Sequence, residues 1–239
     1  EEGEVIPAPL AHLEGAAGDL LADHRRGELA AAMRSLGVVH HLLGATSGDD
    51  RPTYRDSGMA GSAAAEHPRA WAGADLDEAA AAVRAVIEQV CPDVVVTYDA
   101  TGGYGHPDHV RTHDATVRAI AGMTVRPALY VTLTPQSWVL QDREWLAEHV
   151  PQDRELIVPG PHAPFATSVV PDAVVTHAVH DPSVVAAQSQ ALRYHQTQVV
   201  VGDGWYALSN HVVSRLAGRE GYGRFDPLTA QFIEQEESP

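Results

Sequence analysis

The clearest pattern in the chain is an apolar stripe between Asp75 and Val90. Apolar residues recur there at the spacing of one helix face, at Val83, Val86, Ile87 and Val90. Asp75 opens the segment and Glu78 follows three residues later, which is the residue pair of an N-terminal capping box. Pro92 comes directly after the stripe and cannot continue a helix. The pattern predicts an amphipathic helix over 75–90 that packs on a sheet.

A short β-branched run follows this helix. Residues 93–99 read Asp-Val-Val-Val-Thr-Tyr-Asp, which is typical of a strand buried on both faces. A helix that leads into such a strand indicates a parallel α/β sheet. The same order occurs earlier, where a helical pattern that ends at Gly37 precedes an apolar segment over 38–43. We therefore predict an α/β fold with a Rossmann-like, mostly parallel sheet and flanking helices.

The second half of the chain has weaker patterns. Strands are predicted at 128–133, between prolines, and at 173–179, where alternation suits a more exposed strand. A third helix is predicted from Pro182 to Arg193.

The intervening segment, 135–172, contains many prolines and few regular patterns, so we expect a smaller, loop-rich subdomain there. The expected division is an α/β core over 1–134 and a C-terminal subdomain over 135–239 that completes the same fold.

Composition excludes several classes of protein. The 239 residues hold 16 Lys and Arg against 32 Asp and Glu, a net charge of −16. Nucleic acids and anionic membranes are recognised by clustered basic residues, so neither is an expected partner. The single cysteine, Cys91, excludes a disulfide framework and a cysteine-type zinc site, and it favours a reducing compartment. We expect a cytoplasmic protein, and its oligomeric state stays open.

The strongest candidate for chemistry lies directly after the predicted strand over 93–99. Residues 101–109 read Thr-Gly-Gly-Tyr-Gly-His-Pro-Asp-His. Open α/β sheets bind ligands at the carboxyl ends of their strands, and glycines let a backbone approach a ligand closely. His106, Asp108 and His109 are residue types that a divalent metal or an acid–base reaction uses. The alternative is that 101–109 is an ordinary surface loop, since the chain has 14 histidines and not all can belong to a site. Asp108 could likewise be present only because an aspartate is favourable in the first turn of a helix.

The run 94–110 resembles the second signature of the LmbE-like (PIG-L) zinc deacetylases, in particular those of the mycothiol pathway in actinobacteria. Four further segments resemble the same enzymes: 1–6, 55–61, 195–199 and 207–210. The resemblance spans nearly the whole chain and is weakest over 135–170. It implies zinc-dependent hydrolysis of the N-acetyl group of N-acetylglucosaminyl-inositol, giving glucosaminyl-inositol and acetate. The implied partner is therefore a small amino-sugar inositol.

The resemblance also implies roles by position. His109 matches a zinc ligand, and His106 matches the residue that polarises the substrate carbonyl or protonates the leaving amine. Tyr104 matches a tyrosine that holds the developing oxyanion, and Asp108 an aspartate that orients and tunes its neighbouring histidine. Three residues match contacts to the sugar or inositol: Glu4, Arg55 and, with helix capping as its alternative role, Asp75.

The first metal motif of this family, Ala-His-Pro-Asp-Asp-Glu, is absent from the sequence. In the family it carries the other zinc histidine, the general-base aspartate and the aspartate ligand, ahead of the segment that begins here at Glu1. Because residue 1 is not methionine, we expect an N-terminal strand–helix–strand portion to precede this chain. That portion would supply the remaining ligands of one zinc per subunit.

Three other interpretations are open. The related mycothiol-conjugate amidases tend to carry proline at the position of Gly105 and a different loop at 55–59, which favours the deacetylase. A non-catalytic sugar-binding protein is supported only by the absent first motif, and the sheet edge that a lost strand would expose argues against it. A nucleotide-binding Rossmann domain needs Gly-x-Gly-x-x-Gly after a strand, and residues 102–105 do not supply it.

Overall fold

A computed structural model describes residues 8–13, 20–43, 53–151 and 155–233. These residues form two compact units, each assembled from segments that are far apart in the sequence. The first unit draws on 1–41, 138–164 and 180–219, and the second on 42–137, 165–179 and 220–239. The expected boundary between 134 and 135 does not separate these units, because residues 221–225 pair with 129–133 in one sheet.

The sheet of the second unit is mixed. Its strands have the order β1-β2-β8-β4, with β3 on β2 and β9 on β8, and their bounds are β1 (Val94–Thr97), β2 (Ala128–Pro135), β3 (Val169–Val170), β4 (His177–His180), β8 (Arg219–Asp226) and β9 (Gln231–Phe232). β2 runs parallel to β1 and β3, whereas β8 runs antiparallel to β2 and β9. The α/β class is confirmed, but the sheet combines both kinds of pairing rather than being mostly parallel.

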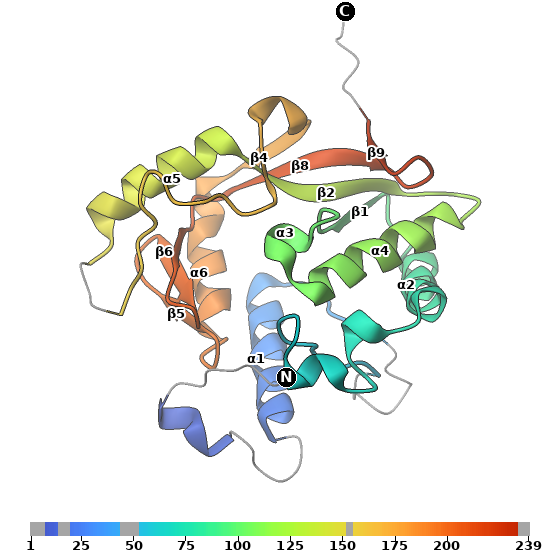
Figure 1. Ribbon diagram of the computed structural model, residues 1–239, viewed down its shortest axis with the longest axis horizontal. Helices are drawn as coiled ribbons and strands as arrows, with labels where there is room; N and C mark the ends of the chain where they lie inside the picture. The colour runs from blue at the N-terminus through green and yellow to red at the C-terminus, as the bar shows by residue number, and fades with distance from the viewer. Residues whose placement is uncertain (1–7, 14–19, 44–52, 152–154, 234–239) are drawn as a thin grey trace, which may run out of the picture. The chain divides into compact units, whose positions relative to one another are not determined.

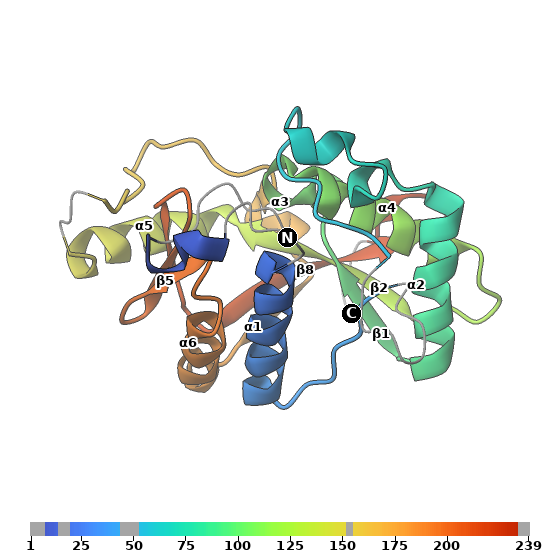
Figure 2. The ribbon, with the colours of Figure 1, turned by 90° about the horizontal axis from the view of Figure 1, so that it is seen from below.

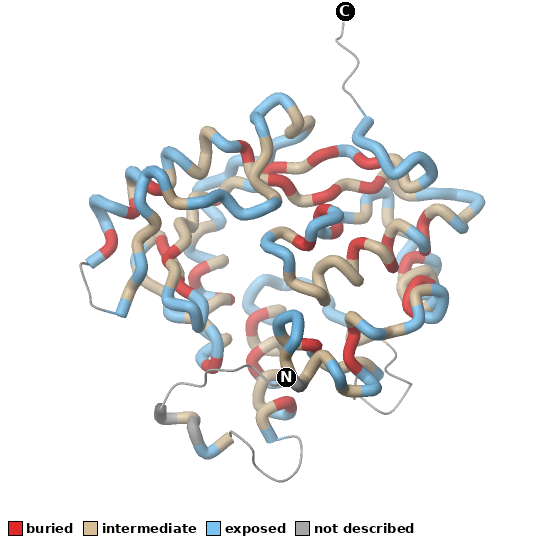
Figure 3. Tube along the Cα trace, viewed as in Figure 1, coloured by how far each residue is buried: buried red, intermediate tan, exposed pale blue. Residues whose placement is uncertain are grey.

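Helices of the second unit lie on one side of this sheet (Figure 1). They are α2 (Leu76–Val90), α3 (Gly102–Gly105) and α4 (Pro107–Ala121). The unit also contains the 3-10 turns η2 (Ala63–Glu66), η3 (Trp71–Gly73) and η4 (Asp172–Val174). α2 packs against α4, and the core between helices and sheet holds Ile87, Ile120, Leu129, Val131, Leu133 and Phe225. Buried residues follow β2 and β8 in Figure 3. Asp75 accepts the backbone N–H groups of Asp77 and Glu78, both at 3.0 Å, which confirms its predicted capping role.

Among its described residues, the first unit has three α-helices and a small antiparallel sheet. Its elements are η1 (Ala8–Leu13), α1 (Leu20–Leu36), α5 (Gln136–His149), η5 (Pro182–Val184), α6 (Val185–Arg193), β5 (Val199–Val201), β6 (Trp205–Leu208) and β7 (Val213–Arg215). α1 and α6 run alongside each other (Figure 2). Buried Glu28 on α1 accepts hydrogen bonds from the backbone N (2.9 Å) and hydroxyl (2.7 Å) of Thr197, which satisfies its carboxylate. In the described segments, no helix combines the length and the apolar character needed to cross a membrane.

Three expectations of local structure are wrong. The strand predicted over 93–99 covers only Val94–Thr97 and is not buried on both faces, since Val94 and Val96 are each 50% exposed. Residues 38–43 form no strand, since no segment of the described chain forms a β-ladder with this apolar run, and Val39 is 99% exposed. The supposedly irregular segment from 135 begins with α5, whose buried side includes Arg143 and Leu146. Because the buried side of α5 includes an arginine, its sequence has no continuous aliphatic stripe, and the apolar periodicity that predicts a helix is weak in this segment.

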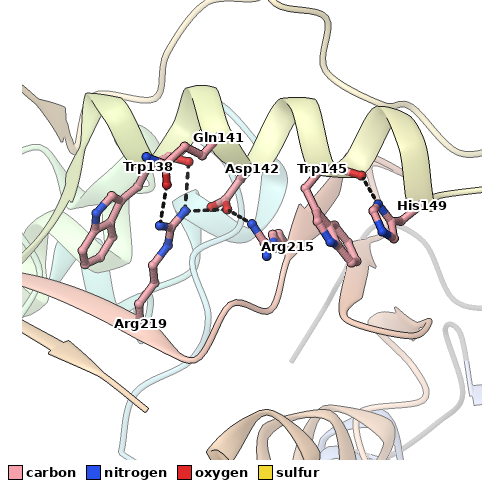
Figure 4. Close-up of polar contacts among 7 residues, drawn as sticks. All are labelled: Trp138, Gln141, Asp142, Trp145, His149, Arg215 and Arg219. Atoms are coloured by element: carbon pink, nitrogen blue, oxygen red, sulfur yellow. Dashed lines mark hydrogen bonds and ion pairs between the residues drawn. The ribbon is translucent and has the colours of Figure 1, made fainter. Parts of the chain in front are cut away.

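Aromatic and charged side chains anchor α5 within its unit (Figure 4). Asp142 accepts hydrogen bonds from Arg215 at 3.2 Å and from Arg219 at 2.6 Å. The Arg215 guanidinium lies 4.7 Å from the centre of the Trp145 ring, and Arg219 lies at the same distance from Trp138. One carboxylate on the helix therefore holds two arginines, each of which also covers an indole face.

Replacing this carboxylate is expected to destabilise the protein. In Asp142→Ala both guanidinium groups lose a charged partner while they stay largely buried, at a cost of about 2 kcal/mol after allowance for partial exposure. For a chain of this size the expected fall in Tm is about 4–8 °C. Thermal unfolding followed by circular dichroism measures it, with Glu144→Ala, an exposed acidic position on the same helix, as the matched control. Equal Tm values for the two variants would contradict the anchoring role.

Candidate functional site

The candidate site is built on the loop that follows β1. Asp99, 6% exposed, accepts the backbone N–H groups of Thr101 at 2.7 Å and Gly103 at 2.9 Å, and also the Thr101 hydroxyl. These bonds fold the glycine-rich loop back onto the end of the strand. Asp99 is not among the residues predicted for the site. Its position just after a predicted strand, directly before the glycines, was the available signal.

Gly102 brings this loop into direct contact with α4. Its φ is +68°, and a Cβ at this position would lie 2.8 Å from the backbone N of Val110 and 3.0 Å from the Cβ of His109. Only glycine fits both the backbone conformation and the space. The loop is thereby packed against the first turn of the helix that carries the histidines.

One ring nitrogen of His109 is held by a hydrogen bond, and the other is available to a ligand. Its Nδ1 lies 3.1 Å from the carbonyl oxygen of Gly102, and its ring stacks on Tyr98 with the ring centres 4.0 Å apart. A carbonyl can only accept, so Nδ1 carries the proton and Nε2 keeps its lone pair. Burial lowers the pKa of His109, although the Gly102 carbonyl opposes this effect. The ring is therefore neutral at pH 7, which is the form that a metal binds.

The ring nitrogens of His106 have the opposite roles to those of His109. His106 caps the N-terminus of α4, where its Nδ1 accepts the backbone N–H of Asp108 at 3.2 Å. In the neutral ring the proton is consequently at Nε2, and that atom is a donor. The ring centre of His106 lies 4.8 Å from that of His109, and the Tyr104 ring meets both histidines edge-on, at 5.9 Å and 5.3 Å. Tyr104 is 53% exposed, so this group can be reached by a ligand.

Asp108 joins α4 to a loop about fifty residues earlier. Its Oδ2 accepts the backbone N–H of Ser57 at 2.9 Å, and its carbonyl accepts the Trp71 indole N–H at 3.1 Å. Ser57 is fully buried, and its hydroxyl accepts the backbone N–H of Ala72 at 2.9 Å. The second carboxylate oxygen, Oδ1, is buried and has no hydrogen-bond partner among the described residues.

The same connection brings Asp56 to the site. Asp56, His106 and Asp108 each offer a potential ligand atom, and these three atoms lie within 4.8 Å of one another. The Asp56 carboxylate also accepts the backbone N–H of Gly58 at 2.7 Å, which orients it. Sequence reasoning missed both Asp56 and Ser57 as site residues. The only available signal was the likeness of segment 55–61 to the family.

The structure gathers most of the residues predicted for the site. Tyr104, His106, Asp108 and His109 lie together on α3 and the first turn of α4. Arg55 lies on the same loop as Asp56, where its backbone N and O bond to Arg69 and Trp71 at 2.8 and 2.9 Å. The Asp75 carboxylate is engaged as the cap of α2, and Glu4 lies outside the described residues.

Comparison with known proteins agrees with this geometry. A family model described as PIG-L, GlcNAc-PI de-N-acetylase, matches residues 9–120. The chain is 43% identical over 238 residues to a protein of Streptomyces avermitilis, with 93% of this chain and 78% of that protein covered. It is 40% identical over 243 residues to one of Streptomyces scabiei, with 93% and 72% covered. For one of Actinosynnema mirum, identity is 41% over 228 residues, with 93% and 77% covered.

All three relatives are named 1D-myo-inositol 2-acetamido-2-deoxy-alpha-D-glucopyranoside deacetylase. Among solved structures, the zinc-inhibited form of teicoplanin deacetylase Orf2 aligns with a TM-score of 0.42 and 19% identity, covering 82% of this chain and 69% of that one. That structural likeness is too low to support a functional argument. On its sequence relatives, the chain belongs to the PIG-L family of de-N-acetylases, a family of hydrolytic enzymes.

Proposed function

We propose that this protein hydrolyses the N-acetyl group of N-acetylglucosaminyl-inositol, giving glucosaminyl-inositol and acetate, with zinc as its cofactor. The observation that carries the proposal is the pair of histidines beside Tyr104, whose Nε2 atoms differ in protonation. His109 presents a lone pair at Nε2, and His106 presents a proton there. The names of relatives at 40–43% identity support the choice of substrate.

The donor chemistry of His109 fits a zinc ligand. Ligating histidines commonly donate the second ring N–H to a carbonyl or carboxylate, as His109 does to Gly102. His109 would therefore hold the ion through Nε2. Zinc bound there supplies Lewis-acid activation of water and of the acetamide carbonyl.

The remaining steps fall to side chains of this chain. Tyr104 is exposed beside both imidazoles and donates its hydroxyl to the oxyanion that develops on the acetamide oxygen. In its imidazolium form, His106 donates its Nε2 proton to the amide nitrogen as the C–N bond breaks, and the ring is left neutral. Asp108 is a positioning residue, because its backbone N–H fixes the His106 ring and its carboxylate holds the loop at Ser57.

Substrate comparison tests the proposal. We expect kcat/KM for N-acetylglucosaminyl-inositol to exceed that for N-acetylglucosamine and for a mycothiol S-conjugate by at least about 100-fold, the scale on which buried polar contacts discriminate. Preference for the S-conjugate would instead assign the protein as a conjugate amidase. Saturable binding of the sugar without hydrolysis by the zinc-loaded protein would indicate a sugar-binding protein.

Gly102→Ala is expected to weaken zinc binding about 10- to 100-fold, because a Cβ in contact with His109 displaces a ligand and its carbonyl partner. Gly61→Ala is the matched control, since Gly61 has a comparable φ of +83° but open space around its Cβ position. Zinc titration of both variants separates the effect of the Cβ contact with His109 from the cost of placing alanine in the left-handed backbone conformation, about 1–2 kcal/mol. Equal zinc affinities in the two variants would contradict this account of Gly102.

A further inference from the structure

We propose that Thr167 is a positioning residue for Tyr104, because it holds the peptide unit that joins Tyr104 to Gly103. Thr167 lies 64 residues after Gly103 in the sequence, in the segment that leads into β3. Its effect on catalysis rests on the proposed function, in which Tyr104 donates to the oxyanion. Its contact with the loop does not depend on that function.

Gly103 has an unusual backbone conformation directly before Tyr104. Its φ is +78° and its ψ is −60°, which are the angles of the rare and strained form of the γ-turn. A conformation of this kind persists only where the surrounding structure holds it in place. The hydrogen bonds at Gly103 are therefore the contacts that decide where Tyr104 lies.

Both backbone polar groups of Gly103 are bound, each by a different segment. Its N–H donates to Oδ2 of Asp99 at 2.9 Å. Its carbonyl oxygen accepts the Thr167 hydroxyl at 2.9 Å and the backbone N–H of Ser168 at 2.9 Å. Because a peptide unit is planar, the two donors at this oxygen also fix the direction of the Tyr104 N–H and Cα.

The segment that supplies these two donors is itself fixed to the sheet. The backbone N–H of Thr134, on β2, donates to the carbonyl oxygen of Ser168 at 3.0 Å. β3 then pairs in parallel with the end of β2, with Val169 opposite Thr134. The Thr167 bond therefore ties the loop after β1 to a segment that β2 holds in place.

The Thr167 hydroxyl has a second neighbour in the same loop. Its oxygen lies 2.8 Å from the hydroxyl oxygen of Thr101. The Gly103 carbonyl can only accept, so Thr167 donates its proton there and turns a lone pair toward Thr101. The single hydroxyl proton of Thr101 thus has two alternative acceptors, Thr167 and Asp99. Thr167 is exposed, so its side chain can be changed without leaving a cavity in the core.

Deacetylation kinetics test the effect on catalysis. Thr167→Val keeps the shape of the side chain but removes the hydroxyl, and we expect kcat to fall at least about 5-fold, the scale of one lost hydrogen bond. KM should change little, because Tyr104 donates to a charge that exists only in the transition state. Thr167→Ser keeps the donor and should retain the wild-type kcat. Thr229→Val is the matched control, since Thr229 is also exposed and its hydroxyl donates to Asp226 at 2.9 Å.

The same substitution in a Tyr104→Phe background separates positioning of Tyr104 from any other effect. Once the Tyr104 hydroxyl is gone, Thr167→Val should lower kcat by less than about 2-fold, because the two residues act as a unit. Losses that simply multiply in the double variant would show that Thr167 acts independently of Tyr104 and would overturn the proposal.

Fluorine NMR of protein labelled with fluorotyrosine reads the surroundings of Tyr104 without catalysis. The resonance of Tyr104 is the one missing from Tyr104→Phe. Thr167→Val should shift or broaden this resonance, whereas Thr167→Ser and Thr229→Val should leave it in place. A Tyr104 resonance that is identical in Thr167→Val and the wild type would contradict the positioning role. If the wild type releases no acetate, the proposed function fails, and the fluorine spectrum still decides whether Thr167 positions Tyr104.

Discussion

His109→Ala is expected to lose the tightly bound zinc and to lower kcat/KM for N-acetylglucosaminyl-inositol by at least about 1000-fold, since metal activation contributes several kcal/mol. The neutral ring and free Nε2 of His109 provide a donor that alanine cannot replace. Zinc content after dialysis and initial rates of acetate release measure the two effects.

The matched control is His40→Ala, which removes an exposed histidine from a segment without helix or strand. It should keep both zinc and activity. A His109→Ala protein that retains one tightly bound zinc would remove His109 from the ligand set, whatever its activity.

His106→Ala is expected to keep the tight zinc and to lose at least about 100-fold in kcat, the scale of one positioned acid. KM should change little, because the proton is transferred only in the transition state. The assay uses one equivalent of zinc. Imidazole added to the variant should restore part of the rate.

The outcome that would exclude His106 as the acid is a variant with unchanged kcat. A parallel loss of the tight zinc would instead assign His106 to the metal site itself. Circular dichroism of the variant checks that α4 still forms without the ring that caps it.

Local signals predicted the part of the fold that carries the site. The cap at Asp75, the stripe to Val90 and the β-branched run over 93–99 each depend on neighbours in sequence, and the helix, its cap and a strand within that run appear in the structure. The strand covers only Val94–Thr97 and is not buried on both faces as predicted, because Val94 and Val96 are each 50% exposed. The glycines of the loop were likewise recognisable from the local sequence. Left-handed backbone at Gly102 is a property of that residue and of the turn it makes.

Long-range contacts set the features that the sequence did not predict. The bond from Ser57 to Asp108 spans 51 residues and brings Asp56 beside His106, a juxtaposition without any periodic signature. Residues 38–43 have the composition of a strand, but strand formation depends on a partner that the described chain does not provide. α5 was missed because its anchors are an ion-pair cluster and indole rings instead of an aliphatic stripe.

The most direct test of the central claim is the release of acetate from N-acetylglucosaminyl-inositol by the zinc-loaded protein. Acetate and free amine are expected to appear in equal amounts, to stop when a chelator removes the metal, and to resume when one equivalent of zinc is restored. If the protein holds its zinc and yet releases no acetate from this substrate, the proposed function is contradicted.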